Sequence, residues 1–577
     1  MIIGGGTAGL AIATRLSQYL PHDRILVIEA GPDARTEPGI VIPGRKGSTL
    51  GGVYDWNFTT VTQPHLNNRS IPQNRGRVLG GSSALNLMSY DRASKAEYDA
   101  WEELGNPGWN WDSMYPSMLK SENFTYTHGP GTYGRAGVGF GGPVQMAINE
   151  FVPQHQLAYI PTMEGLGIQQ NLESLSGNMI GVMYHMSSLR VSNYTRSYSV
   201  DYLVLAGENL LILTNTTVKK INFDGKKATG VTLRDNSVIT AAKEVILSAG
   251  TLQSPTLLEF SGIGNSSLLA TAGIEVIEDL PGVGENLQDH LRIQNSYQLK
   301  SNYTSFDILR YNASSASSQL ALWNSGQRSM YDYTGSGYAF LNWTQVVGAN
   351  STTYAELLSL AQQAARSSTS PINTKKLAYL TNATLSAMVP QLEIIFSDGY
   401  TGVKGYPPTN SSLYGSNFFT LIGAIQHPFS RGNIHINGSN PGGGPIINPN
   451  YAKAEYDRLA VKMATQFLRR IANSLPLRDV WVTEYEPGST VQSEEDWNAF
   501  VRNTALTIYH PVSTCAMMPR EKGGVVDAQL KVYGVKGLRV VDASVIPILV
   551  SAHIQTAVYG IAEKAAELIR DEWARMN

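Results

Sequence analysis

Cysteine is almost absent from the sequence, because Cys515 is the only one in 577 residues. A disulfide needs two cysteines, so no bridge can form within the chain. The thiol lies between Thr514 and the apolar run Ala516-Met517-Met518. This setting predicts an inert buried thiol rather than a nucleophile.

Long apolar runs and a strong net charge are also missing. No uninterrupted apolar segment approaches the roughly 20 residues of a membrane-spanning helix, since Asp542, Pro547 and His553 break up even the apolar C-terminal part. A net charge of −2 gives no electrostatic reason to bind nucleic acid or an anionic membrane. We therefore expect that the protein binds neither nucleic acid nor a membrane. We also expect no metal site. With 577 residues, the chain is too long for a single core and predicts at least two structural units.

What the sequence has in abundance is Asn-x-Ser/Thr. Thirteen such sequons occur, and seven of them fall between Asn302 and Asn437. The thirteen asparagines are Asn57, Asn68, Asn123, Asn193, Asn215, Asn265, Asn302, Asn312, Asn342, Asn350, Asn382, Asn410 and Asn437. Their number favours a secreted protein that carries N-glycans. No signal peptide is recognisable, and the chain opens inside an apolar strand, so we expect that residues upstream were removed or left out.

The first residues carry a dinucleotide-binding pattern. Met1-Ile2-Ile3 is the end of a buried strand, Gly4-Gly5-Gly6-Thr7-Ala8-Gly9 follows, and the next residues form a helical pattern. Gly4 makes a tight turn, Gly6 lets the backbone approach a pyrophosphate, and Gly9 lets the helix pack on the strand. The helix N-terminus offers N–H groups to the phosphates.

A carboxylate stands where this pattern requires one. A second apolar strand, residues 24–28, ends in Glu29, which is placed to accept hydrogen bonds from ribose hydroxyls. An acid at this position disfavours the 2′-phosphate of NADP, and it leaves both NAD and FAD open.

Several later stretches repeat the alternation of strand and glycine. Residues 76–86 (GRVLGGSSALN) form a second backbone-lined concavity, and the side chain of Asn86 offers a donor and an acceptor to a ring edge. Residues 126–143 are expected to form a loop that acts as a lid or channel wall. Amphipathic spacing predicts helices over residues 455–475 and 556–574.

These stretches together resemble the glucose–methanol–choline (GMC) family of FAD-dependent oxidoreductases. Residues 76–90 resemble its first signature, and residues 250–264 (GTLQSPTLLEFSGIG) match its second at every defined position. Residues 280–290 (LPGVGENLQDH) also match. The resemblance covers essentially the whole chain and implies FAD as the cofactor.

The resemblance implies an α/β fold with two domains. A doubly wound FAD-binding domain would comprise residues 1–150, 205–295 and 510–577. A substrate domain, built on an antiparallel sheet with helices, would comprise residues 151–204 and 296–509.

Cofactor contacts follow from the same resemblance. Thr7, Ala8, Glu29 and Ala30 would hold the ADP half, and the backbone of Val218 would meet the adenine. Ser82, Asn86, Leu87 and Ser89 would run along the pyrophosphate and flavin, while Asp542 and Ala543 would close on the phosphates; Thr556 is included as a further cofactor residue. Relatives with covalent flavin have a histidine just before Asn86, and Leu85 occupies that position here. We therefore expect non-covalent FAD.

The resemblance also identifies two catalytic histidines. His510, in Tyr509-His510-Pro511, corresponds to the family's catalytic base, and His553 corresponds to its second active-site position. A histidine suits the removal of a hydroxyl proton because its pKa lies near working pH. His510 would take the proton, His553 would hydrogen-bond the substrate oxygen, and the hydride would pass to flavin N5. A serine hydrolase is disfavoured because neither glycine-rich signature contains a Gly-x-Ser-x-Gly elbow.

The expected substrate is a primary aryl or unsaturated alcohol. Leu506 and Ile508 precede His510 where glucose-active relatives place polar residues, and a sugar's hydroxyls would then face apolar side chains. Electrons would pass to O2 or a quinone. A glucose-type sugar dehydrogenase or oxidase and a non-redox cyclase on the same fold remain as alternatives.

Overall fold

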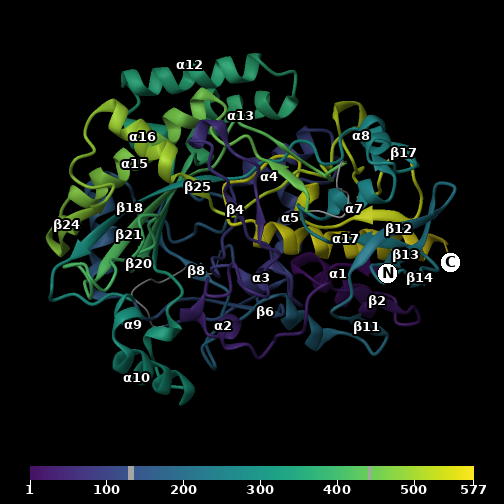
Figure 1. Ribbon diagram of the computed structural model, residues 1–577, viewed down its shortest axis with the longest axis horizontal. Coiled ribbons are helices and arrows are strands. Elements are labelled where there is room, and N and C mark those ends of the chain that lie inside the picture. Colours follow the sequence, from purple (N-terminus) through teal and green to yellow (C-terminus); the bar gives the residue numbers. More distant parts are fainter. Residues whose placement is uncertain (128–135, 439–443, 577) are drawn as a thin grey trace.

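In the computed structural model, which describes residues 1–127, 136–438 and 444–576, the chain forms two main sheets with helices packed around them (Figure 1). The N-terminal and C-terminal segments meet in one half of the molecule. Much of the chain between about residues 290 and 505 forms the other half, whereas residues 210–279 lie beside the two termini. Among the helices of these residues, none combines the length and apolar character needed to cross a membrane.

The first sheet is parallel and gathers strands from distant parts of the chain. Its order is β11 (Leu210–Leu213), β2 (Ile25–Ile28), β1 (Ile2–Ile3), β15 (Val245–Leu247) and β26 (Leu538–Val540). Every neighbouring pair is parallel. The central strands are short Ile/Val/Leu runs, as expected for strands covered on both faces.

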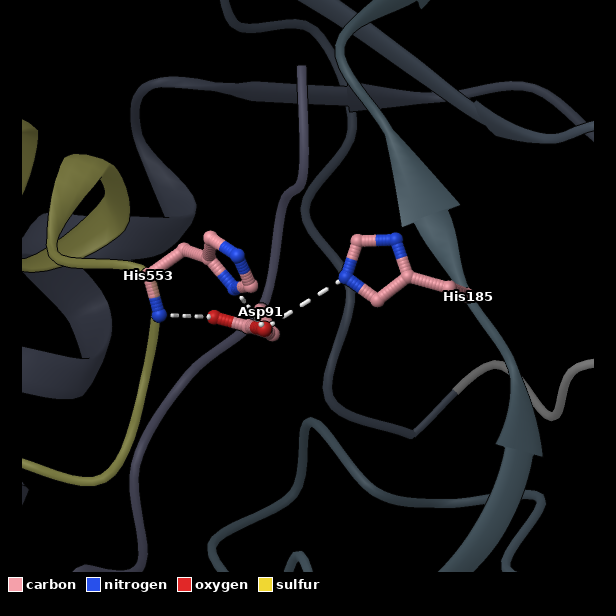
Figure 2. A group of neighbouring side chains, drawn as sticks. All are labelled: Asp91, His185 and His553. Carbon is pink, nitrogen blue, oxygen red and sulfur yellow. Dashed lines mark hydrogen bonds and ion pairs between the residues drawn. The ribbon is translucent and has the colours of Figure 1, made fainter. Parts of the chain in front are cut away.

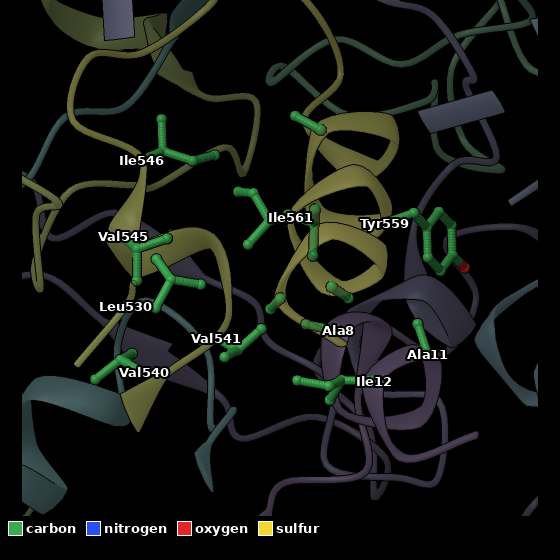
Figure 3. Close-up of a cluster of buried hydrophobic side chains, with 14 of the residues drawn as sticks. Ala8, Ala11, Ile12, Leu530, Val540, Val541, Val545, Ile546, Tyr559 and Ile561 are labelled. Carbon is green, nitrogen blue, oxygen red and sulfur yellow. The ribbon is translucent and has the colours of Figure 1, made fainter. Parts of the chain in front are cut away.

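Two helices from opposite ends of the sequence pack on this sheet. α1 (Thr7–Tyr19) follows the first strand, and α17 (Gln555–Met576) ends the chain and lies beside it. Figure 3 shows Ala8 and Ile12 of α1 in one buried cluster with Ile561 of α17 and Val541, which follows β26. The dinucleotide loop after β1 is therefore held on a rigid, fully packed base.

The second sheet is antiparallel. Its order is β24 (Trp481–Glu486), β18 (Leu291–Leu299), β21 (Phe418–Ile425), β20 (Leu392–Asp398), β19 (Gly337–Leu341) and β7 (Gly181–Tyr184), and β25 (Leu506–Thr507) pairs with β18. The amphipathic helix α15 (Glu455–Asn473) packs its buried Leu468 and Ala464 on this sheet. Helices α12 (Thr352–Arg366), α13 (Pro371–Thr381) and α16 (Glu494–Thr504) surround it.

The expected architecture is confirmed, with one difference of detail. α15 and α17 end within two residues of the helices predicted from amphipathic spacing. β18 crosses residue 295, where the sequence predicted a domain boundary, because its strand begins directly after the turn that holds His290. The boundaries themselves stay a prediction. The loop predicted over residues 126–143 lies partly outside the described residues, at residues 128–135.

Candidate active site

A cavity of about 1360 Å³ lies between the two sheets and takes lining residues from both. Fifteen of the residues predicted from the sequence line it: Gly4, Gly6, Thr7, Ala8, Glu29, Ala30, Ser82, Asn86, Leu87, Ser89, Val218, His510, Asp542, Ala543 and His553. Gly9 and Thr556 do not line it. Both lie in helices behind the wall, where Thr556 is buried and a Cβ on Gly9 would be 1.9 Å from the carbonyl oxygen of Gly4.

Two glycine-rich loops touch in the wall of this cavity. The N–H of Gly80 donates to the carbonyl oxygen of Gly5 at 2.7 Å, and Gly81 has a φ of +52°. A Cβ on Gly81 would be 2.7 Å from the Cα of Gly6. Only glycine permits so close an approach, and it leaves bare backbone N–H groups at the start of α1.

Glu29 is held at the end of β2 by two backbone donors. Its carboxylate oxygens accept from the N–H groups of Gly5 and Gly31, each at 2.8 Å. Burial raises the pKa of Glu29 to about 7, although these two hydrogen bonds lower it. A buried carboxylate beside the glycine loop fits the position that a ribose would occupy.

Other predicted side chains are already engaged by the protein. The Asn86 amide donates to Gln555 and accepts from the Met88 N–H at 3.0 Å and from Arg196 at 2.7 Å. The sequence suggested that this amide would read a ring edge, but both of its ends are used inside the fold. Asp542 accepts from the Gly250 N–H at 2.8 Å, which ties the loop after β15 to the end of β26.

The lining fits the FAD that the sequence implies. The two glycine loops open at a helix N-terminus, Glu29 lies at the neighbouring strand end, and the cavity continues from there to the histidines. Asn86 and Asp542 already form hydrogen bonds within the protein. A cofactor at this place would therefore contact backbone groups more than free side-chain groups.

His510 lines the cavity, and contacts to its backbone and its ring hold its orientation. Its backbone N–H donates to the buried Asp289 at 2.8 Å, and its ring Nδ1 lies 2.9 Å from Nδ1 of His290. Burial lowers the pKa of His510 well below the usual value for histidine, and the nearby charge of His553 lowers it further. His510 is therefore a neutral imidazole at physiological pH.

His553 lies beside it in the opposite electrostatic setting, with ring centroids 4.9 Å apart. Its Nδ1 lies 2.8 Å from the carboxylate of Asp91 and 3.5 Å from that of Glu393. Burial lowers the pKa of His553, but the two carboxylates raise it, to about 9. The two histidines thus differ in charge at neutral pH, which is the pattern of an acid–base pair.

His185 completes the surroundings of Asp91, as Figure 2 shows. Its Nε2 lies 3.4 Å from the carboxylate, and its ring stacks on Tyr338 with centroids 3.7 Å apart. One ligand atom from each of Asp91, His185 and His553 lies within 4.8 Å of the others, which is a geometry that could also hold a metal ion.

The sequence did not single out four residues that shape this site: His290, Asp91, Gln555 and Lys46. His290 was quoted only as part of a family motif, and Asp91 lies 462 residues from its partner His553. Lys46 lines the cavity, and burial lowers its pKa to about 7, with a further lowering by Arg196. A cationic residue in a Gly/Pro-rich stretch was the only sequence signal for it.

Of the two apolar residues expected beside His510, one faces the cavity. Ile508 lines the wall and packs against a cluster that includes Tyr338, Ile395 and Ile422. Leu506 pairs in β25 with β18 and packs against the core of the second sheet. Ile508 comes after the end of this two-residue strand, Leu506–Thr507, so the strand does not fix its direction.

Known proteins resemble the chain over nearly its whole length. Two family models, each described as GMC oxidoreductase, match residues 1–292 and 428–562. The GMC oxidoreductase family protein Mala s 12 of Malassezia sympodialis is 37% identical, with 99% of this chain and 92% of that protein covered.

Solved structures share the fold as well. An FAD-dependent oxidoreductase from Chaetomium thermophilum superposes with a TM-score of 0.87 at 30% identity, covering 99% of both chains. A fungal aryl-alcohol oxidase superposes with a TM-score of 0.85 at 29% identity, covering 99% of this chain and 98% of that one. Because the two family models together match most of the chain and a family member is 37% identical over nearly its whole length, the chain belongs to the GMC oxidoreductase family.

Proposed function

We propose that this oxidoreductase uses non-covalently bound FAD to oxidise a primary aryl or unsaturated alcohol to the aldehyde. The observation that carries the proposal is the pairing, at one end of the cavity, of a neutral His510 with a charged His553. When bound, FAD supplies the acceptor for the hydride that leaves the alcohol carbon.

His510 is the base. Nδ1 of His510 faces Nδ1 of His290 at 2.9 Å, so one of the two must carry the proton. If His510 donates, its Nε2 carries a lone pair, and no described residue hydrogen-bonds this atom. His290 then positions the ring and fixes the tautomer that can take the hydroxyl proton.

His553 is the hydrogen-bond donor. A positively charged ring that gives its Nδ1–H to a carboxylate still carries an Nε2–H, and His553 lines the cavity. A hydrogen bond from this N–H to the substrate oxygen stabilises the negative charge that develops as His510 removes the proton.

The wall beside His510 favours an apolar substrate. Ile508, Ile395 and Ile422 line the cavity and belong to one buried apolar cluster. Sugar hydroxyls placed against these side chains would lose their hydrogen bonds to water, whereas an aromatic or alkenyl group would lose none. The structural likeness to a fungal aryl-alcohol oxidase supports the same substrate class.

FAD would be held by the two glycine loops and Glu29, with Leu85 in the cavity wall instead of a linking histidine. The FAD-dependent relative from Chaetomium thermophilum supports this cofactor. Electrons would leave to O2 or to a quinone.

The test is a substrate panel of aryl, alkenyl, aliphatic and sugar alcohols. Each is added anaerobically and the bleaching of the flavin is followed, and turnover is then compared with O2 and with a quinone dye. We expect the highest kcat/KM for a benzylic or unsaturated primary alcohol. A higher kcat/KM for glucose would favour a sugar-oxidising enzyme, and no bleaching with any alcohol would favour a non-redox cyclase.

A further inference from the structure

Asp91 does not line the cavity, yet it makes the closest contacts to His553. It is 3% exposed and follows Ser89 and Tyr90 directly after the second glycine loop. Its Oδ1 accepts from the backbone N–H of His553 at 2.6 Å, and its Oδ2 lies 2.8 Å from the ring Nδ1. A single carboxylate thus holds both the backbone and the ring of His553 (Figure 2).

We propose that Asp91 is a positioning residue that makes His553 the fixed hydrogen-bond donor of the active site, by accepting its Nδ1–H and balancing the charge of its ring. The proposal rests on the proposed function and assigns Asp91, with His185 behind it, a part in that reaction.

The donor direction follows from the chemistry of the contacts. An ionised carboxylate can only accept hydrogen bonds, so the nitrogen atoms that face Asp91 must carry hydrogen. His553 therefore has Nδ1–H and His185 has Nε2–H. His553 is left with Nε2 as the one ring atom that can serve the substrate.

The charges around His553 favour a cation on this ring rather than on its neighbours. Burial lowers the pKa of His185 to about 4, although Asp91 raises it, so His185 donates as a neutral ring. Burial raises the pKa of Glu393 to about 7, although His553 lowers it. His510 and Lys46 also face the site, and the charge of Lys46 lowers the pKa of His553. Burial alone would raise the pKa of Asp91. The pKa is lowered instead, because His553 and His185 stabilise the ionised carboxylate.

The same three residues have the donor types of a divalent metal site. In the structure their facing atoms already satisfy each other: Asp91 accepts from both histidines, and the second ring nitrogen of His553 is the one that the reaction needs. A donor role therefore accounts for the arrangement without a metal, and a chelator can test the alternative.

The first experiment measures the binding of benzoate to the holoenzyme from pH 6 to 10, by the change in flavin absorbance. Benzoate resembles an aryl alcohol but carries a fixed negative charge, so its affinity reports the charge of His553. For the wild type we expect constant affinity up to about pH 9 and a fall of roughly tenfold per pH unit above it, as the ring loses its proton.

Asp91→Asn keeps an oxygen that can accept the Nδ1–H but removes the charge. Its affinity should begin to fall at least about one pH unit lower, since a neighbouring opposite charge shifts a pKa by roughly one to three units. His553→Gln, which cannot titrate, should lose this pH-dependent fall altogether. That loss would assign the fall to His553 rather than to Lys46.

Asp457→Asn is the matched control. Asp457 is also fully buried and also accepts two backbone N–H groups, those of Phe429 at 2.7 Å and Ser430 at 2.8 Å, but it lies in α15 and does not line the cavity. The same change there should leave the midpoint of the benzoate titration where the wild type has it.

Two outcomes would overturn the proposal. One is a fall in benzoate affinity that has the same pH midpoint in Asp91→Asn as in the wild type. The other is a wild-type midpoint below about pH 7.5, which can be measured even if the variant does not fold. A midpoint that moves after dialysis against EDTA would assign the three residues to a metal instead. Because benzoate binding requires no turnover, the result does not depend on which alcohol the enzyme oxidises. If the substrate panel fails while the benzoate titration behaves as expected, the substrate class is wrong and Asp91 keeps its role.

Discussion

Two histidines whose ring centroids lie 4.9 Å apart have opposite ionisation in this protein, and the cause is their neighbours. His510 faces another histidine, His290, whereas His553 faces two carboxylates. A neutral ring can take a proton, and a charged one can donate a hydrogen bond to an oxygen that is becoming negative. At the residue scale, the neighbours of each ring therefore decide which histidine can act as the base and which can act as the hydrogen-bond donor.

His510→Ala should slow the reduction of the flavin by the best alcohol about 10²-fold or more, which is at least about 2.7 kcal/mol of activation free energy. The measurement is anaerobic stopped-flow reduction. His553→Ala should have a smaller effect, because water can replace a hydrogen-bond donor more easily than a positioned base. Flavin content serves as the control, since the two glycine loops and Glu29, rather than His510, are expected to hold the cofactor. Wild-type reduction rates in His510→Ala with full flavin occupancy would show that another group is the base.

At this scale, the family resemblance was enough to single out two histidines that line the cavity, and their catalytic roles stay a prediction. It could not predict their protonation. Asp91 is 462 residues from His553, and His290 is 220 residues from His510. No spacing rule relates residues that meet only when the two sheets assemble.

At the scale of the elements, the contact between the two glycine loops leads to a specific prediction about FAD binding. Gly81 has a φ of +52°, and a Cβ there would be 2.7 Å from Gly6. Gly81→Ala should therefore force the loops apart and lower the FAD content of the purified protein, measured as the ratio of flavin absorbance to protein absorbance.

Gly225→Ala separates backbone strain from this clash. Gly225 also has a φ of +52°, in the turn between β12 (Val218–Asp224) and β13 (Lys227–Leu233), but a Cβ there meets nothing within 4 Å. Both glycines have this positive φ, so both alanine variants should lose some stability. Only Gly81→Ala should lose flavin. Equal flavin content in the two would mean that the contact does not shape the cofactor site.

A second consequence belongs to the short helix α3 (Ser82–Leu85), which forms part of the cavity wall. Leu85 has no atom that could bond covalently to a flavin, so we expect the yellow colour to move to the supernatant when the protein is precipitated with acid. The measurement is the flavin absorbance of supernatant and pellet. Fluorescent flavin that stays with the polypeptide through denaturing electrophoresis would contradict this.

Elements were predictable where the local pattern is strong. The strand, glycine turn and helix at residues 2–19 needed no tertiary information, and neither did the amphipathic α15. The orientation of individual side chains was less accessible. Leu506 and Ile508 were expected together beside the base, but strand pairing in β25 turns Leu506 into the core and leaves Ile508 at the cavity. The Asn86 amide likewise faces Gln555 and Arg196, which come from distant segments.

On the scale of the whole molecule, the site is assembled from segments that are far apart in the sequence. The parallel sheet supplies the first glycine loop and Glu29, the antiparallel sheet supplies Ile395 and Ile422, and the segment that holds His510 joins them. The cavity wall therefore changes its chemistry from backbone N–H groups at one end to apolar side chains at the other. Such a gradient suits a phosphate-bearing cofactor that meets an apolar substrate.

The surface of the molecule bears on where the protein works, and we propose that it is a secreted glycoprotein. Nine sequon asparagines are exposed: Asn57, Asn68, Asn193, Asn215, Asn302, Asn312, Asn350, Asn382 and Asn410. The other four are half-buried, and none of the thirteen is buried. A glycan needs an accessible side chain and a surface loop or helix end, and these positions provide both.

We therefore expect the protein, when it is produced through a eukaryotic secretory pathway, to migrate well above the 62.7 kDa of its polypeptide and to return to that mass after treatment with peptide N-glycosidase. Asn302→Gln, at an exposed sequon, should lower the mass by one glycan. Asn342→Gln is the comparison, because the side chain of this half-buried residue caps α11 (Trp343–Val347) by accepting from the Gln345 N–H. Its substitution should change the stability more than the mass. A secreted protein of 62.7 kDa before any treatment would contradict the proposal, since it would mean that thirteen accessible sequons are all ignored.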